Sequence, residues 1–366
     1  MVADARLSHA AALERDLVDS RARSARITAD FEGPRLLGPR LAIVNPPLWE
    51  IGHVGWFQEY WCLRLKPDGT RSESMLEGAD RLYDSAKVAH DTRWDLPLPD
   101  LAATRRYAAA VLERVRERLA REPEDESLRY FVRLATFHED MHAEAFLYTH
   151  HTLGYGNPFP ELAMPEAKEK KDIAVSGGKF MLGAKRNGAF VFDNEKWAHE
   201  VEVKPFRIAA APVSNAEFLA FVEDGGKAPR YWREEGGRWL ERRFDRWAPP
   251  APQEPVLHVD WNEAQAYCAW AKRRLPTEAE RELAAASGRI ENAAGVWEWT
   301  SSDFGPYPGF EIDPYKEYSQ PWFGNHKVLR GGSFAAPARL LRDTFRNFYM
   351  PNRADVFCGF RTCALD

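Results

Sequence analysis

Hydrophobic residues recur at helical spacing in four stretches of the first 160 residues. In the clearest of them, residues 103–121, four large apolar residues stand four positions apart, as on one face of an α-helix. These residues are Tyr107, Val111, Val115 and Leu119. Comparable patterns predict helices at residues 6–30, 47–64 and 125–153. Four helices, with a long connection at about residues 66–102 between the second and the third, indicate a helical bundle.

The pattern changes after a charge-rich link at residues 165–173. Gly and Pro become frequent, the apolar runs become short, and turn signals separate them, which is typical of loop-rich α+β structure. Only two further helices are predicted, at residues 214–224 and 262–285, and the second is interrupted at Pro276.

The length of 366 residues agrees with two domains, which we place at residues 1–165 and 170–366. Hydrophobic residues make up 45% and charged residues 29% of the chain, so wholesale disorder is excluded. The net charge of −5 gives no reason to expect a nucleic-acid partner. No apolar stretch is long enough to cross a membrane, and the charged N-terminal region lacks the apolar core of a signal peptide. With only four scattered Cys, we expect a cytoplasmic protein without membrane partners or disulfides.

Two histidines of the fourth predicted helix form the most informative motif. His138 and His142 are four residues apart, so both imidazoles lie on one helical face and can bind the same metal ion. With Glu139 they also spell H-E-x-x-H, the pattern of zinc peptidases, in which the Glu is the general base. The bland alternative is a pair of surface or core histidines.

A third ligand is available on the second predicted helix. His53 lies among apolar and aromatic residues, where a polar group needs a partner. Helices two and four of a bundle can face each other across the core. A site of His53, His138 and His142 would be neutral in its ligands and would keep open positions, as catalytic metals do. Iron, copper and zinc all suit imidazole, and a satisfied core histidine remains an alternative for His53.

Six segments of the second half, in order, resemble the formylglycine-generating-enzyme/sulfatase-modifying-factor fold, a variant of the C-type lectin fold. They are GGKFMLGA (177–184), PVSNAEFLAFVEDGG (212–226), PVLHVDWNEAQAYCAWAKRRLPTEAERELAA (255–285), AGVWEWTSS (294–302), KVLRGGSF (327–334) and CGFRT (358–362). The first half resembles the DinB-like four-helix domain. Joined in this order, the halves resemble the ergothioneine synthase (sulfoxide synthase) family. The resemblance implies an α+β chain with a DinB-like iron-binding bundle at 1–165 and a lectin-like domain at 170–366.

Members of this family are non-haem Fe(II) enzymes that use O2 to join a sulfur donor to C2 of the hercynine imidazole. The resemblance implies that His53, within HVGWFQE, and the pair His138 and His142 hold the iron. Glu144 matches a further Glu of the family motif. The resemblance also implies a tyrosine near the metal, for which Tyr307 is the candidate and Tyr315 the alternative.

The resemblance further implies a substrate pocket at the domain junction, lined by an FRN-aromatic segment. Asn347 and Phe348 would contact hercynine, because an aromatic face attracts a trimethylammonium group. Core packing is an equal alternative for Phe348. Arg353 is a candidate for the hercynine carboxylate, although a solvated surface Arg is the plainer interpretation.

Three departures from the family concern the sulfur donor. The stretch after the second helix holds no close Arg pair to bind the carboxylates of γ-glutamylcysteine. Tyr349 stands where those enzymes place an Asp for the donor's amine, and Met141 stands where Gln is frequent. A pocket without these groups has lost its means of holding a dipeptide. The resemblance is therefore strongest to selenoneine synthase, which joins hercynine to a selenosugar, and a thiol donor (γ-glutamylcysteine or cysteine) is the alternative.

Three other classes stay open. A zinc peptidase would use His138, Glu139 and His142. A formylglycine-generating oxidase would need two copper-binding Cys shortly before the final GFR segment, where this chain has none; Cys358 and Cys363 flank that segment instead. A non-catalytic binding module on the lectin-like fold would leave the three histidines without a purpose.

Overall fold

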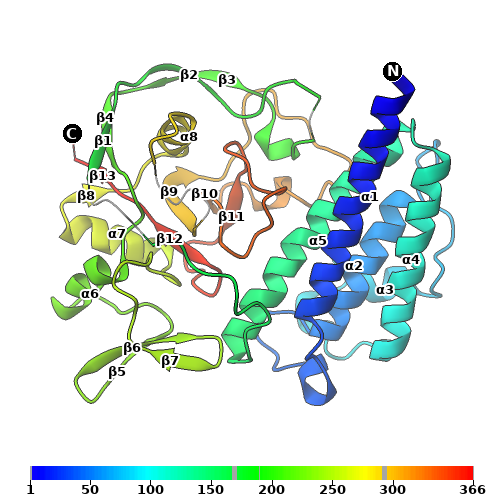
Figure 1. The fold of residues 1–366 in the computed structure, drawn as a ribbon, viewed down its shortest axis with the longest axis horizontal. Coiled ribbons are helices and arrows are strands. Elements are labelled where there is room, and N and C mark those ends of the chain that lie inside the picture. Colours follow the sequence, from blue (N-terminus) through cyan, green and yellow to red (C-terminus); the bar gives the residue numbers. More distant parts are fainter. Residues whose placement is uncertain (1, 167–170, 189, 291–294, 366) are drawn as a thin grey trace. The chain divides into compact units, whose positions relative to one another are not determined.

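The chain divides into two compact units, Met1–His150 and His151–Asp366 (Figure 1). The computed structural model describes residues 2–166, 171–188, 190–290 and 295–365. Residues 167–170 of the predicted link and the first residue of the 294–302 segment lie outside the described residues.

Unit 1 is a bundle of four long helices, which Figure 1 shows side by side. They are α1 (Val2–Ile27), α2 (Pro47–Cys62), α4 (Leu101–Arg121) and α5 (Glu126–Leu153). All four predicted helices are confirmed, with ends that differ by at most four residues. Shorter elements occupy the connections: η1 (Gly33–Leu36), α3 (Ala79–Tyr83) and η2 (His90–Thr92). Asp100 caps α4 by accepting a 2.7 Å hydrogen bond from the Ala103 amide.

Helix α2 is the central element of unit 1, since nearly all its side chains are buried. A helix that is apolar all round belongs in a core. Two glycines let its neighbours approach. A Cβ on Gly52 would lie 2.3 Å from the Tyr83 ring, and one on Gly55 would lie 3.1 Å from Cβ of Ala108. The close fit of α3 and α4 against α2 therefore depends on these two positions.

The described residues of unit 2 contain short strands in four separate sheets. Two sheets have four strands each, in the orders β1-β4-β13-β8 and β11-β10-β9-β12, and β2-β3 and β5-β6-β7 are antiparallel ribbons. Only the β9–β12 pair among the described strands is parallel. The strands are β1 (Asp172–Val175), β2 (Gly178–Leu182), β3 (His199–Val203), β4 (Phe206–Ala209), β5 (Trp232–Glu235), β6 (Arg238–Arg243), β7 (Arg246–Ala248), β8 (Arg273–Arg274), β9 (Trp297–Asp303), β10 (Lys327–Gly331), β11 (Asn347–Tyr349), β12 (Cys358–Phe360) and β13 (Cys363–Ala364).

Three α-helices accompany these sheets: α6 (Asn215–Glu223), α7 (Trp261–Trp270) and α8 (Glu278–Ala286). Two one-turn helices, η3 (Asp193–Glu195) and η4 (Gln320–Trp322), complete the unit. The interrupted helix predicted at 262–285 is in fact two helices, because the chain between α7 and α8 runs through strand β8. Thr277 then starts α8 with a capping box that it shares with Glu280. The α+β fold class, with a helical bundle followed by a sheet-rich unit, is confirmed.

Candidate metal centre

Three histidines of unit 1 meet at one point. His53 comes from α2, and His138 and His142 come from successive turns of α5. Their ligand nitrogens all lie within 4.8 Å of one another, and Nε2 of His53 is 3.3 Å from Nε2 of His138. Within the described residues, no other group of three His, Cys, Asp or Glu side chains is arranged to hold a metal ion. The triad that spacing and environment suggested is therefore assembled by the fold.

Aromatic rings enclose two of the three imidazoles. The Phe57 ring stacks on His138 at a centroid distance of 3.6 Å and an angle of 5°. Trp49 stacks on His53 at 4.8 Å and 11°, and the Arg93 guanidinium lies 3.8 Å from the centre of the Trp49 ring. These contacts fix the planes of His53 and His138 by packing.

Hydrogen bonds on the outer nitrogens fix two of the ligands further. Nδ1 of His53 donates to the Tyr83 carbonyl at 2.8 Å. Nδ1 of His142 lies 2.5 Å from Oε1 of Glu50, a residue of α2. A neutral imidazole whose Nδ1 carries the proton keeps its Nε2 lone pair for a ligand. Both contacts therefore favour the tautomer in which Nε2 serves the centre.

Burial keeps His53 and His138 neutral. Desolvation lowers the pKa of His53 and of His138 well below the ordinary value, and the neighbouring His142 adds to both shifts. Neutral imidazole is the form that binds a metal ion. Three neutral imidazoles suit Fe(II), Cu(II) or Zn(II) and leave coordination positions for further ligands. The residues present therefore fit a catalytic metal.

Glu139 has a structural role that the peptidase hypothesis did not foresee. Its two carboxylate oxygens accept hydrogen bonds from Arg21 of α1, at 2.7 Å from Nε and 3.2 Å from Nη2. Arg21 also donates to Gln58 and to the Ala108 carbonyl. Glu139 is thus held in an ion pair with Arg21, whereas the general base of a zinc peptidase has to reach the metal-bound water. Use of the H-E-x-x-H motif by a zinc peptidase stays a prediction.

The other residues predicted near the ligands lie on α5. Met141 precedes His142 and is half-buried, and Glu144 is buried. A role of Met141 toward a substrate stays a prediction.

Three of the predicted substrate-binding residues, Asn347, Phe348 and Tyr349, form strand β11 of unit 2. Phe348 stacks on Phe304 at 4.0 Å and 10°, and its amide donates to the Asn347 side chain at 2.9 Å. Tyr349 lies with its ring centre 5.4 Å from the guanidinium of Arg353. These three β11 residues are half-buried, so their side chains are partly accessible. Their substrate contacts stay predictions.

Arg353 itself is neutralised within unit 2. Its guanidinium donates to both carboxylate oxygens of the buried Asp355, at 2.5 and 2.8 Å. A contact of Arg353 with the hercynine carboxylate stays a prediction, and it would have to compete with this ion pair.

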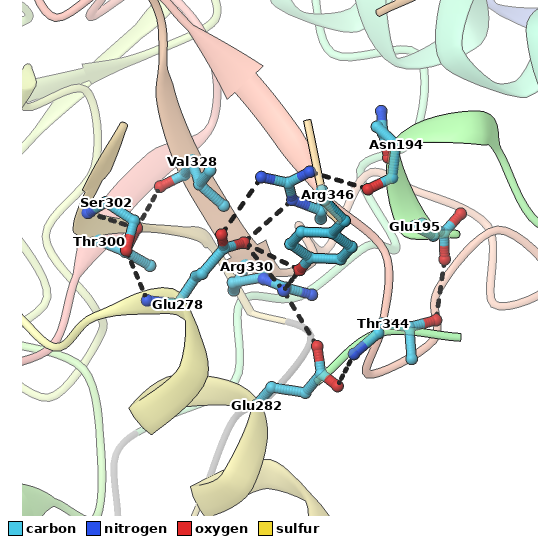
Figure 2. Close-up of polar contacts among 12 residues, drawn as sticks. Asn194, Glu195, Glu278, Glu282, Thr300, Ser302, Val328, Arg330, Thr344 and Arg346 are labelled. Atoms are coloured by element: carbon cyan, nitrogen blue, oxygen red, sulfur yellow. Dashed lines mark hydrogen bonds and ion pairs between the residues drawn. The ribbon is translucent and has the colours of Figure 1, made fainter. Parts of the chain in front are cut away.

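Tyr307 lies in a buried network of charges in unit 2, part of which Figure 2 shows. Its hydroxyl accepts a 2.9 Å hydrogen bond from Arg330 and donates to Glu278 at 3.2 Å. Glu278 also accepts from Arg346 at 2.9 Å. Burial raises the pKa of Tyr307 far above its ordinary value. Tyr315 is half-buried, with its ring 5.9 Å from that of Tyr318. The catalytic role of a tyrosine stays a prediction.

Sequence reasoning missed the groups that support the triad. Glu50 had a usable signal: it is an acidic residue in an apolar helix, three positions before His53 and thus on the same face. The Tyr83 carbonyl and the Arg93 guanidinium had none, since both come from the long connection between α2 and α4, whose path no periodicity predicts.

The four cysteines are buried and form no disulfide. Burial raises the pKa of each thiol, so none of them resembles a metal-binding thiolate. None of the helices in the described part of the chain combines the length and the apolar character needed to cross a bilayer.

Comparison with known proteins identifies the class from both units. The DinB superfamily model matches residues 16–146, and the sulfatase-modifying factor enzyme 1-like domain model matches residues 159–294 and 290–365. The chain is thus a two-domain protein that joins a DinB-type bundle, here with a histidine triad, to a sulfatase-modifying-factor domain.

Relatives with known names identify the family of the chain, and two of them match over nearly their whole length. The hercynine oxygenase of Mycolicibacterium thermoresistibile is 34% identical, over 96% of this chain and 94% of that protein. The hercynine oxygenase of Mycolicibacterium smegmatis is 32% identical, over 94% and 97%. Ergothioneine biosynthesis protein 1 of Schizosaccharomyces pombe is 29% identical over 47% of this chain and 27% of that protein. The chain belongs to the hercynine oxygenase family, of the ergothioneine synthase type, and is an oxidoreductase.

Proposed function

We propose that the protein is an O2-dependent non-haem iron(II) enzyme that joins C2 of the hercynine imidazole to a chalcogen donor. The observation that carries the proposal is the triad of His53, His138 and His142, whose ligand nitrogens lie within 4.8 Å of one another. The full-length relatives named hercynine oxygenase supply the substrate and the use of oxygen.

The overall reaction balances as a four-electron oxidation. Formation of the bond removes one hydrogen from imidazole C2 and one from the chalcogen. One oxygen atom of O2 goes to the chalcogen, and the other leaves as water with the two hydrogens. Iron held by the three histidines would supply the redox chemistry of this reaction. The protein keeps His53 and His138 neutral by burial and brings the ligand nitrogens of all three histidines within 4.8 Å of one another.

For the donor we propose a selenosugar rather than a γ-glutamyl dipeptide. Residues 81–100 of the connection after α2 hold three cations, Arg81, Lys87 and Arg93, and no adjacent arginines for the carboxylates of a dipeptide. Lys87 pairs with Asp84 at 2.7 Å. Arg93 is half-buried over Trp49 and donates to Asn45 at 2.6 Å and to the Val88 carbonyl at 3.3 Å. A sugar presents hydroxyl groups, which neutral side chains can bind. The relative named for ergothioneine biosynthesis supports the alternative, a thiol donor.

A competition assay tests the donor. The protein is loaded anaerobically with Fe(II), mixed with hercynine and an equimolar selenosugar and γ-glutamylcysteine, and exposed to O2; cysteine replaces the dipeptide in a parallel series. The products are separated by mass. We expect the selenium adduct to dominate. Dominant turnover of either thiol would overturn the selenosugar proposal and leave hercynine oxidation intact, whereas absence of any hercynine adduct would overturn both.

A further inference from the structure

Glu50 is a carboxylate in an unusual position. Glu50 is 1% exposed, and its neighbours along α2 are apolar or aromatic. An ionised group in such surroundings is costly unless the fold gives it partners. The partner of Glu50 is His142, whose Nδ1 lies 2.5 Å from Oε1 of Glu50.

Arg93 is a half-buried cation next to the same part of α2. Burial lowers the pKa of Arg93 to about 10, and the negative charge of Glu50 opposes this shift. The Arg93 guanidinium is held over the face of Trp49, whose ring also stacks on His53. Arg93 is therefore linked to His53 through the Trp49 ring, and Glu50 contacts His142 directly.

The two supported ligands differ in their acceptors. His53 donates to a neutral backbone carbonyl, whereas His142 faces a carboxylate. A backbone carbonyl follows from the path of the chain, but a carboxylate requires a particular side chain. His142 is also the less buried of the two imidazoles, so packing alone restrains it less.

We propose that Glu50 is a positioning residue of the metal centre. By accepting the Nδ1 proton of His142, it fixes the tautomer and the ring orientation in which Nε2 is the ligand atom. Carboxylate acceptors behind a histidine ligand typically change metal affinity by about 10- to 100-fold. The inference rests on the proposed metal site, and the experiment below separates the two.

The first measurement is metal affinity. Anaerobic Fe(II) and Co(II) binding is measured by competition with a chromophoric chelator for the wild type and for Glu50→Ala, Glu50→Gln and Glu139→Gln. We expect Glu50→Ala to bind about 10- to 100-fold more weakly. Glu50→Gln should lose less, because its amide oxygen can still accept the proton. Glu139→Gln is the matched control, since it removes a buried carboxylate next to His138 that is paired with Arg21, and it should stay within about threefold.

The second measurement is the tautomer of His142, which a merely structural role of Glu50 would not move. Nitrogen-15 spectra of the metal-free, histidine-labelled protein should show Nδ1–H at His142 in the wild type and in Glu139→Gln. In Glu50→Ala the Nε2–H form should become populated. This readout needs only the wild type if Glu50→Ala does not fold.

The outcomes separate the two proposals. An Nε2–H tautomer of His142 in the wild type, or unchanged metal affinity of Glu50→Ala beside tight binding by the wild type, would overturn the role of Glu50. An equal loss in Glu139→Gln would also overturn it. If the wild type binds neither ion, the metal site and the inference that rests on it both fail.

Discussion

The buried Glu298 network of unit 2 and the histidine triad of unit 1 satisfy their polar side chains in different ways. In unit 2, Glu298 accepts four hydrogen bonds from Arg281 and Arg361, at 2.7 to 3.0 Å, and is itself fully buried. Each charge there faces an opposite charge of the same unit. In unit 1, the imidazoles of His53 and His138 are both uncharged and face each other with Nε2 atoms 3.3 Å apart.

The contrast separates a stabilising network from a binding site. An ion pair that is complete within the fold fixes the positions of strands and helices and leaves nothing for a ligand. A cluster of neutral lone pairs, held from behind by hydrogen bonds on the outer nitrogens, gains most when a metal ion arrives. The following predictions test this division.

The largest effect is expected for His53→Ala. Loss of one of three ligands should reduce bound Fe(II) to less than about a tenth of an equivalent and turnover by about 1,000-fold or more. Metal analysis and an adduct assay measure both. Circular dichroism should stay unchanged. Retention of full metal content and activity would remove His53 from the centre.

Glu298→Ala should destabilise unit 2 without affecting the metal. Removing the carboxylate leaves Arg281 and Arg361 buried without their shared partner, which costs about 3–5 kcal/mol in the free energy of unfolding. Denaturant titration measures this loss, and Glu223→Gln at the exposed end of α6 is the control. A loss of Fe(II) affinity in folded Glu298→Ala would contradict the division between the units.

Tyr307→Phe tests whether a residue of the unit 2 network can also be catalytic, as the family resemblance predicts for Tyr307. Loss of hydrogen bonds to Arg330 and Glu278 should lower stability by about 1.5–3 kcal/mol. If Tyr307 also supplies a proton, turnover should fall by about 100-fold or more with metal affinity unchanged. If the turnover of Tyr307→Phe falls only in proportion to the fraction of folded protein, Tyr307 has a structural role in the unit 2 network and no catalytic role.

A smaller effect concerns pH. Burial lowers the pKa of His258 to about 3, and the stacked His151 is lowered as well. In the unfolded chain, His258 therefore becomes protonated below about pH 6.5, whereas in the folded protein it stays neutral down to about pH 3. The free energy of unfolding is therefore fully retained above pH 6.5 and decreases as the pH falls from 6.5 toward 3. Between pH 7 and pH 5, protonation of His258 in the unfolded chain should lower the free energy of unfolding by about 2 kcal/mol.

His258→Asn should remove that share of the pH dependence. Asn tolerates the left-handed backbone of this position, where φ is 62°. Unfolding free energies at pH 7 and pH 5, for the wild type and the variant, provide the measurement. An equal pH dependence in both proteins would assign the acid sensitivity to other groups.

Much of unit 1 follows from local sequence patterns. The apolar spacing of residues 103–121 predicted α4, and the i, i+4 spacing of His138 and His142 placed two ligands on one face. His53 was recognisable because its neighbours on α2 are apolar and aromatic. These features depend on residues within one or two helical turns, which is the range that periodicity covers.

The pairings in unit 2 could not be predicted in the same way. Glu278 meets Arg346 across 68 positions of the chain, and no local spacing links them. The strands are short, and β9 pairs with β12 in parallel after a long excursion. Even the role of Glu139 was decided by Arg21, on another helix 118 residues earlier. Such contacts depend on topology, which the resemblance to known families indicated but local patterns did not.

Gly52 limits how this chain can be altered by mutation. The Tyr83 ring occupies the space that any larger residue at position 52 would need, and the same Tyr83 supplies the carbonyl that holds His53. A substitution at position 52 therefore requires a smaller partner at position 83 and places the neighbouring ligand at risk. In protein engineering, residues 52 and 83 therefore have to be substituted together or left unchanged.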